Sequence, residues 1–162
     1  MTPACTIRDA TGADRDFLVE ANAAMALETE GKRLDLAVLA RGVDGVFADP
    51  ARGFYLVAER EDRHVGGLLV TREWSDWRNG DWWWIQSVYV VPGARRSGVF
   101  RALHGEVERR ARATPGVVGL RLYVEDANAA AKATYAALGL RDARYRLLEQ
   151  AFTATRSAIG RG

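Results

Sequence analysis

A short basic loop between a strand-like run and a helix-like run is the segment of this sequence best suited to bind a ligand. The apolar run Val88–Val91 ends just before it, and an amphipathic run begins at Phe100. The first N–H groups of a helix lack helical partners and lie at the positive end of its dipole, so they attract anions. Gly98 permits a close backbone approach, and Arg95 and Arg96 add positive charge. The loop therefore predicts a ligand that carries a diphosphate.

Two familiar phosphate-binding motifs do not match this loop. A GxxxxGK(S/T) loop needs a lysine and a hydroxyl residue after its last glycine, and Gly98 is followed by valine and phenylalanine. A dinucleotide fingerprint needs three glycines in GxGxxG spacing, and only Gly98 is in place. The sequence therefore indicates neither a nucleotide triphosphatase nor a dinucleotide-binding domain.

The composition is that of one globular domain. The chain has 162 residues, of which 48% are hydrophobic and 27% are charged, a balance typical of soluble domains with a hydrophobic core. We predict a single domain over residues 1–152 and a flexible end over 153–162. No run is apolar enough to cross a membrane, and the first twenty residues lack the apolar core of a signal peptide. A cytoplasmic protein without a membrane partner is expected.

Cysteine, histidine and charge exclude several classes of site. Cys5 is the only cysteine, so no disulfide can form within the chain and no cysteine cluster can hold a metal. His64 and His104 are far apart in sequence, and no metal is predicted. The formal net charge is only +2, whereas nucleic-acid binders usually carry a clustered basic excess. No nucleic-acid partner is predicted; an RNA-binding alternative rests on arginine content alone and would require steep salt dependence.

Hydrophobic periodicity predicts an α+β domain with a mixed sheet. The predicted helices cover residues 11–28, 34–47, 96–113 and 128–138, and the predicted strands cover 6–8, 54–59, 64–73, 82–91, 117–124 and 144–150. Asn79-Gly80 is a strong hairpin signal between two of the strands. Asn128 is placed to cap the last helix and Gly139 to end it.

The loop and its surroundings resemble the GCN5-related N-acetyltransferase family, abbreviated GNAT. Residues 95–100, Arg-Arg-Ser-Gly-Val-Phe, are similar to the family's acetyl-CoA signature Q/R-x-x-G-x-G/A, except that Phe100 replaces a small residue. Downstream, Asn128, Ala131, Tyr135 and Gly139 resemble the pattern N-x-x-A-x-x-x-Y-x-x-x-G-F, with leucine in place of the final phenylalanine. The likeness extends from residue 82 to residue 140.

The resemblance implies a fold and a mode of cofactor binding. The family has three layers and a mainly antiparallel, twisted sheet whose fourth and fifth strands splay apart. The pantetheine arm of acetyl-CoA lies between these strands, and the pyrophosphate lies on the loop before the next helix. Carried over to this sequence, the cofactor-binding residues are Val88, Tyr89, Val90, Arg95, Arg96, Ser97, Gly98, Val99, Phe100, Asn128 and Ala131.

The resemblance also implies a catalytic acid. A tyrosine in the helix after the fifth strand often protonates the departing thiolate in this family, and Tyr135 is the matching residue. Many relatives place a glutamate on the fourth strand as base. By the period of two, Trp82, Trp84, Gln86, Val88 and Val90 share one face of that strand. Trp84 and Gln86 occupy the candidate positions, and neither accepts a proton at neutral pH. The base is therefore not assigned.

Acidic and aromatic residues predict a site for a cationic amine. Flat aromatic rings and carboxylates bind cations well, and both kinds gather in two segments on the expected acceptor side. The predicted acceptor-binding residues are Glu28, Glu30, Trp74, Asp76, Trp77 and Gln86.

Together these features predict an acetyl-CoA-dependent N-acetyltransferase. It would transfer the acetyl group directly, in a ternary complex, to a primary amine of a small molecule or peptide. The alternative is a catalytically degenerate acyl-CoA-binding module with a regulatory role. A two-fold homodimer is expected from the frequency of such assemblies.

Overall fold

The computed structural model describes residues 4–152, so the predicted flexible end over 153–162 lies outside the described residues. The strands are β1 (Thr6–Asp9), β2 (Phe54–Arg60), β3 (Arg63–Ser75), β4 (Gly80–Val90) and β5 (Val117–Leu122). The helices are α1 (Arg15–Glu30), α2 (Leu36–Ala48), α3 (Val99–Ala113) and α4 (Ala129–Ala137), with 3-10 turns at Gly12–Asp14 and Pro92–Ala94.

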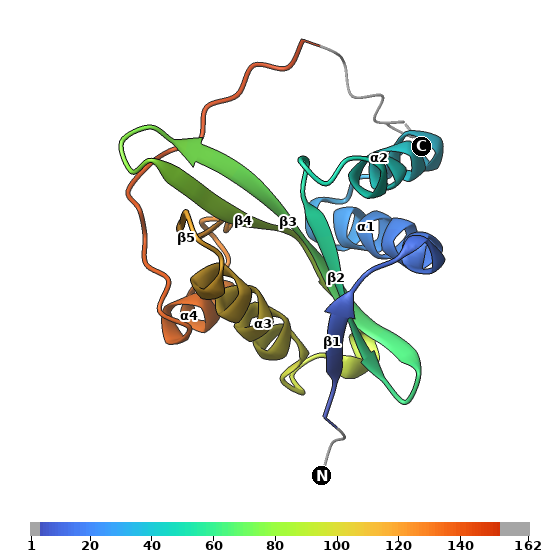
Figure 1. The fold of residues 1–162 in the computed structure, drawn as a ribbon. Helices are drawn as coiled ribbons and strands as arrows, with labels where there is room; N and C mark the ends of the chain where they lie inside the picture. Colours follow the sequence, from blue (N-terminus) through green and yellow to red (C-terminus); the bar gives the residue numbers. More distant parts are fainter. Residues whose placement is uncertain (1–3, 153–162) are drawn as a thin grey trace.

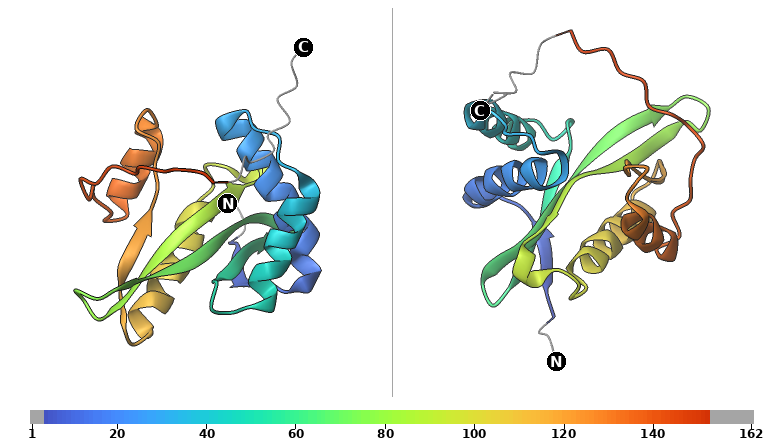
Figure 2. Two further views of the ribbon diagram at one scale, coloured as in Figure 1. Left: turned by 90° about the horizontal axis from the view of Figure 1, so that it is seen from above. Right: turned by 180° about the vertical axis from the view of Figure 1, so that it is seen from behind.

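The five strands form one sheet in the order β1-β2-β3-β4-β5. All neighbouring pairs are antiparallel except β4 and β5, which are parallel and joined through α3. Helices α1 and α2 cover one face of the twisted sheet and α3 and α4 cover the other (Figures 1 and 2). This arrangement confirms the predicted three-layer α+β fold, including its mainly antiparallel sheet.

Two hydrophobic cores hold the layers together. Successive side chains of a strand point to opposite faces, so in β2 Leu56 packs toward α3 and Val57 toward α1 and α2. The core on the α3 side includes Leu103 and Val107, both fully buried, and the other core includes Leu18. The central strands are thus buried on both faces and form a rigid base for the site.

Both ends of α4 form where the sequence predicts them. The Asn128 side chain accepts a hydrogen bond from the Ala131 N–H at 3.0 Å and caps α4. Gly139, with φ of +88°, follows the helix, as predicted for a residue that ends it. At α1, Gly31 adopts φ of +63° and donates to the last carbonyls. Within the described part of the chain, no helix combines the length and apolar character needed to cross a membrane.

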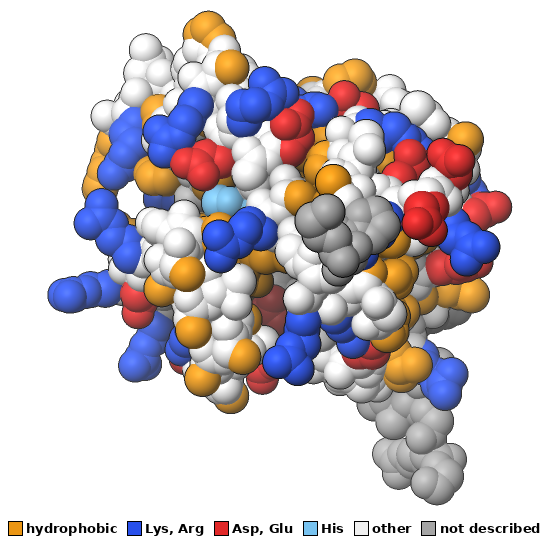
Figure 3. Space-filling model, turned by 90° about the horizontal axis from the view of Figure 1, so that it is seen from below, with side chains coloured by type: hydrophobic (Ala, Val, Ile, Leu, Met, Phe, Trp, Pro, Cys, Tyr) orange, Lys and Arg blue, Asp and Glu red, His pale blue; other side chains and the backbone are white. Residues whose placement is uncertain are grey.

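The arginine run late in α3 is paired with acids of the same helix. Arg109 and Arg110 both contact Glu106, and Arg112 contacts Glu108, at 2.7 Å in each case. Basic and acidic side chains are interspersed over the face of the molecule seen in Figure 3. The run is therefore a solvated, charge-balanced helix face.

A β-bulge in β4 corrects the predicted face of that strand. Leu69 pairs with Gln86 and Gly67 with Tyr89, so β4 carries an extra residue between them. Ser87 there adopts the left-handed φ of +51°, the conformation that a glycine takes in one class of bulge. The extra residue reverses the alternation of side chains beyond it. Before the bulge, Trp82, Trp84 and Gln86 lie on the face of the sheet that α1 covers, and after the bulge Tyr89 lies on that face. Val88 and Val90, predicted on that face, instead pack into the α3 core.

The predicted strand over residues 144–150 is wrong. Residues 140–150 have no regular secondary structure and are nearly all exposed. The segment leaves α4 and crosses to the top of the view in Figure 1 without joining the sheet. Alternating apolar residues form a strand only where a neighbouring strand offers hydrogen-bond partners, and the described chain offers none along this path.

Candidate active site

The parallel pair β4–β5 separates half-way along β4. Its pairing ends at Ile85 and Leu122, whereas β4 continues to Val90. In the described residues, Gln86–Val90 therefore pair with β3 on one edge only. The splay predicted from the family resemblance is present, and it leaves backbone N–H and C=O groups of β4 available to an extended ligand.

A cleft of about 870 Å³ opens at this separation. Its walls come from the end of α1, the last residues of β4, the loop before α3, the first turn of α3 and the inner side of α4. The lining residues are Met25, Glu28, Thr29, Val88, Tyr89, Val90, Ala94, Arg95, Arg96, Gly98, Val99, Phe100, Arg101, Ala131, Ala133, Thr134, Tyr135, Ala137 and Leu138.

The cleft brings together most of the predicted donor-site residues. Its lining includes the predicted residues Glu28, Val88, Tyr89, Val90, Arg95, Arg96, Gly98, Val99, Phe100, Ala131 and Tyr135. The predicted residues outside its lining are Glu30, Trp74, Asp76, Trp77, Gln86, Ser97 and Asn128. Asn128 caps α4, and the Ser97 hydroxyl forms hydrogen bonds within the loop before α3. Both residues therefore stabilise the walls of the cleft without lining it.

The loop before α3 holds an open helix N-terminus toward the cleft. Arg96 and Gly98 adopt left-handed φ values of +61° and +85°. The Ser97 hydroxyl donates to the Ala94 carbonyl at 2.6 Å and accepts from Arg60 at 3.2 Å, which fixes the loop. Gly98 is the N-cap and has no side chain to cap the helix. The first-turn N–H groups thus remain available to an anion, and this geometry fits a diphosphate.

Tyr135 enters the cleft from α4. Its ring packs edge-on against Phe100 of α3, with centroids 5.6 Å apart. Burial raises the pKa of the Tyr135 phenol above its ordinary value, because the charged phenolate is poorly solvated there. The hydroxyl is therefore protonated at neutral pH and can serve as a proton donor.

A charged link joins α1, β4 and the loop across the cleft. The Glu28 carboxylate accepts from the Arg95 guanidinium at 2.5 Å and from the Tyr89 hydroxyl at 3.2 Å. The Arg95 side chain also donates to the Val90 carbonyl at 3.0 Å and lies over the Tyr89 ring. The sequence predicts Glu28 on the acceptor side and Arg95 on the donor side, but contains no signal for their contact.

The aromatic residues at the β3–β4 hairpin divide into two groups. Trp84 donates to Glu73 at 2.7 Å, and Arg121 binds the same carboxylate while lying over the Trp82 ring at 4.1 Å. Trp74 and Trp77 are exposed at the hairpin tip. A strand rises about 3.3 Å per residue, so the tip lies roughly 30 Å along β4 from Tyr89. The structure does not bring Trp74, Asp76 and Trp77 together with Glu28 and Glu30.

Gln86 lies on the α1 face of β4, where it donates to the Thr71 hydroxyl at 2.5 Å. The β-bulge separates Gln86 from Tyr89 along β4, and both side chains lie on the face of the sheet that α1 covers. Glu30 is ion-paired with Lys32 on the surface at the end of α1. Gln86 therefore adjoins the cleft, and Glu30 faces solvent beyond it.

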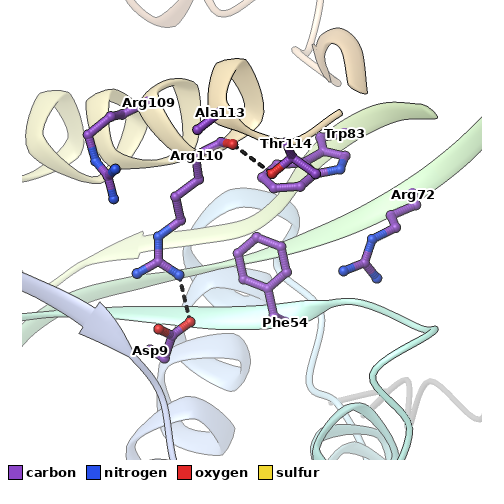
Figure 4. Close-up of a pocket in the computed structure, with 8 residues that line it drawn as sticks. All are labelled: Asp9, Phe54, Arg72, Trp83, Arg109, Arg110, Ala113 and Thr114. Atoms are coloured by element: carbon purple, nitrogen blue, oxygen red, sulfur yellow. Dashed lines mark hydrogen bonds and ion pairs between the residues drawn. The ribbon is translucent and has the colours of Figure 1, made fainter. Parts of the chain in front are cut away.

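A second hollow of about 400 Å³ lies between the sheet and the far end of α3 (Figure 4). Its aromatic floor is formed by Phe54 and Trp83, whose rings meet edge-to-face at 5.2 Å. Arg110 points across the hollow to Asp9 at 2.7 Å, and Arg109 is paired with Glu106. None of the predicted site residues lines it, and its arginines from α3 are neutralised by acids.

A buried charge cluster was not apparent from the sequence. Asp14 is only 2% exposed, and its carboxylate accepts from Arg8 at 2.8 Å and from the Thr11 N–H at 2.7 Å. His64 Nε2 lies 2.7 Å from the same carboxylate, and Glu59 completes the group. Arg8 binds both acids, so its guanidinium provides the positive charge that a metal ion would supply. The cluster ties β1, β2 and β3 to the start of α1.

Comparison with protein families decides the assignment. Residues 18–140 match the model of the Acetyltransferase (GNAT) family. The chain belongs to the GNAT acetyltransferase family. A crystal structure of a possible acetyltransferase from Clostridium difficile 630 has 40% sequence identity and a TM-score of 0.86, over 93% of this chain and 99% of that one.

Two further solved structures share the fold of this GNAT protein. An integron cassette protein from the mobile metagenome of Cole Harbour Salt Marsh has 22% identity and a TM-score of 0.79, over 91% of this chain and 90% of that one. A predicted acetyltransferase from Clostridium acetobutylicum, crystallised with acetyl-CoA, has 16% identity and a TM-score of 0.74, over 91% and 96% of the two chains. No curated protein matches the sequence.

The glycine of the GNAT loop gives the first prediction. Gly98→Ala is expected to weaken acetyl-CoA binding about tenfold, because a side chain disfavours the left-handed conformation by roughly 1–2 kcal/mol. A Cβ at Gly98 would meet no atom within 4 Å, so the backbone and not a clash is responsible. Calorimetric titration with acetyl-CoA measures the effect. Gly93→Ala, also in open space but without a left-handed φ, is the matched control; equal affinities of both variants would contradict the prediction.

Proposed function

We propose that this GNAT protein transfers an acetyl group from acetyl-CoA to a primary amine of a small molecule or peptide. One observation carries the proposal: the free edge of β4, the uncapped start of α3 and the Tyr135 hydroxyl all meet in a single cleft. Direct transfer in a ternary complex is favoured, because Cys5, the only cysteine, lies outside the cleft lining.

The donor is held by backbone more than by side chains. The amide-containing pantetheine arm would pair with the free edge of Val88–Val90 as an added strand does. The pyrophosphate would bind the first-turn N–H groups after Gly98, with Arg96 beside it. Binding mainly by backbone groups would let the loop accept Phe100 in place of the small residue of the family's signature. The Phe100 ring packs toward α4 against Tyr135.

Tyr135 supports the chemical step. The amine attacks as its neutral form, so a cationic acceptor first loses a proton to solvent. A bond then forms from nitrogen to the thioester carbonyl carbon, the bond from that carbon to sulfur breaks, the nitrogen loses its second proton to solvent, and the leaving thiolate needs a proton. The Tyr135 hydroxyl, kept protonated by burial, donates that proton. General acid catalysis of this kind contributes about 10²- to 10⁴-fold to a rate.

Glu28 supports recognition of the amine. Of the described residues that line the cleft, it is the only one with a carboxylate. It lies on α1 opposite the donor loop, where an acceptor would approach the thioester past Gln86 and Tyr89. A protonated amine would be attracted to this carboxylate in competition with Arg95, so we infer a cationic acceptor.

Removing the charge of Glu28 tests this role. Glu28→Gln is expected to raise the acceptor KM about tenfold, since a hydrogen bond to a charged group contributes about 1.5–3 kcal/mol. Steady-state kinetics at saturating acetyl-CoA measure it. Glu30→Gln removes a carboxylate of the same helix end that does not line the cleft, and it should leave KM unchanged. If instead Asp76→Ala or Trp77→Ala raises KM and Glu28→Gln does not, the acceptor binds at the hairpin tip.

The reaction itself is tested with an amine panel. The protein is mixed with acetyl-CoA and each amine, thiol release is followed, and the acetylated product is identified by mass spectrometry. Release that depends on one amine class supports the transferase. Calorimetric binding of acetyl-CoA with no release above background would identify a binding module, and no binding at millimolar concentration would overturn the proposal.

A further inference from the structure

The hollow at the far end of α3 has the size and the lining of a small-molecule site. Its volume of about 400 Å³ falls within the range of about 300–1,000 Å³ that ligand pockets occupy. Helix α3 ends at Ala113, whereas β3 and β4 continue past it to their hairpin. The hollow lies between the last turns of the helix and this part of the sheet (Figure 4).

Side chains from three neighbouring strands form the sheet side of the hollow. Arg72 of β3 and Trp83 of β4 are direct cross-strand partners, and Phe54 of β2 pairs with Val70, two positions before Arg72. Side chains two positions apart lie on the same face of a strand, so all three point to the α3 face. The Arg72 guanidinium lies 5.7 Å from the centre of the Phe54 ring. In Figure 4 the nitrogen-bearing edge of the Trp83 indole is on the side of Arg72. Aromatic surface and a cationic group are thus adjacent.

Arg72 gives the hollow a positive charge that no acid neutralises in the described chain. The arginines of α3 at this place are paired with acids, and the Asp9 carboxylate is bound by Arg110 at 2.7 Å. Arg72 instead donates to the uncharged Pro50 carbonyl at 2.8 Å. A guanidinium has five N–H donors, so Arg72 keeps donors for an anion.

We propose that this hollow binds a small aromatic carboxylate. The ring of the ligand would lie against Phe54 and Trp83, and its carboxylate would accept two parallel hydrogen bonds from Arg72, the geometry that a guanidinium favours. An aromatic cation would be repelled by Arg72, and an inorganic anion would leave the aromatic surface uncovered. The combination of ring and carboxylate satisfies both parts of the hollow.

This site is separate from the cleft between β4 and β5. The two sets of lining residues have no member in common. Phe100 lines the cleft near the start of α3 and Ala113 lines the hollow at its end, which places them about 20 Å apart along the helix. Both sites can be occupied at once, so this inference does not rest on the proposed transferase activity.

NMR spectroscopy of the full chain with indole-3-acetate as the probe tests the site. The indole N–H resonance of Trp83, identified as the one missing from Trp83→Phe, should shift saturably with a dissociation constant of about 1 mM, as expected for a molecule of this size. The shift should persist in the presence of saturating acetyl-CoA. No saturable shift up to about 10 mM probe, or displacement of the probe by acetyl-CoA, would overturn the proposal.

Matched ligands separate the ring from the charge. Indole-3-acetamide keeps the ring and loses the charge, and acetate keeps the charge and loses the ring. Each should bind at least about fivefold more weakly than indole-3-acetate. Equal affinities of indole-3-acetate and either matched ligand would overturn the proposed class of ligand.

Matched variants test the part of Arg72. Arg72→Gln should raise the dissociation constant for indole-3-acetate about tenfold and that for indole-3-acetamide less than about twofold. Arg112→Gln changes an exposed arginine of α3 that does not line the hollow, and it should leave both constants unchanged. Circular dichroism confirms that the variants are folded. Equal weakening by the two variants would overturn the assignment of Arg72.

Discussion

Tyr135→Phe is expected to lower kcat about 100-fold while changing the affinity for acetyl-CoA by no more than about twofold. The substitution removes the proton that the thiolate needs but keeps the ring that packs against Phe100. Thiol release measured at saturating acetyl-CoA and acceptor gives kcat, and calorimetry gives the affinity. If kcat and the affinity for acetyl-CoA both fall, the hydroxyl mainly maintains the shape of the cleft.

Tyr123→Phe is the matched control for this prediction. Tyr123 is exposed beyond β5 and packs at a tilt against Trp84, outside the cleft lining, so its hydroxyl should not affect kcat. Because burial raises the pKa of Tyr135, the acid is present throughout the neutral range. Its deprotonation should reduce kcat only above the ordinary tyrosine pKa of about 10. If Tyr135→Phe has the wild-type kcat, the prediction is contradicted, and the Tyr135 side chain serves only in packing.

Asp14→Asn is expected to lower the free energy of unfolding by about 2 kcal/mol, because it removes the buried, charged acceptor of two hydrogen bonds from Arg8. Urea unfolding at neutral pH, followed by circular dichroism, measures this loss. Asp16→Asn, two residues along the chain, removes an exposed carboxylate that contacts only Arg15 and should change stability by less than about 0.5 kcal/mol.

The Asp14 carboxylate also makes the stability of the fold depend on pH in the acid range. Hydrogen bonds from Arg8 lower the pKa of Asp14 far below its ordinary value. A carboxylate with a lowered folded-state pKa stabilises the protein fully above its unfolded-state pKa, near 4, and progressively less as the pH falls below it. Unfolding free energy should therefore decline from about pH 5 downward in the wild type. Asp14→Asn should show a clearly shallower decline, and parallel curves would contradict this assignment.

Local signals predicted the strands and helices around the cleft well. The sequence from the strand before Pro92 to Gly139 contains each feature in one continuous stretch: an apolar strand, a glycine at the helix start and Asn128 placed to cap the next helix. Such signals depend on backbone geometry within a few residues. The structure confirms the strands β4 and β5, Gly98 at the start of α3, the Asn128 cap of α4 and the separation of β4 from β5.

Longer-range features could not be predicted from the sequence in the same way. The bulge at Ser87 arises from the pairing of β4 with β3, and the strand alternation alone gave the wrong face for Val88 and Val90. The contact of Glu28 with Arg95 and that of Asp14 with Arg8 depend on packing between elements distant in the chain. The strand expected over residues 144–150 had the right alternation but no partner.

The lining of the cleft has a consequence for how such a protein can diversify. Apart from Met25, Glu28 and Thr29, every residue that lines it falls between Val88 and Leu138. One contiguous stretch thus supplies most of the lining, including the residues proposed to bind the acetyl donor, and α1 supplies the remaining wall. If the proposed function holds, substitutions at Met25 or Thr29 of α1 would alter the acceptor side of the cleft and leave the stretch proposed to bind the donor unchanged.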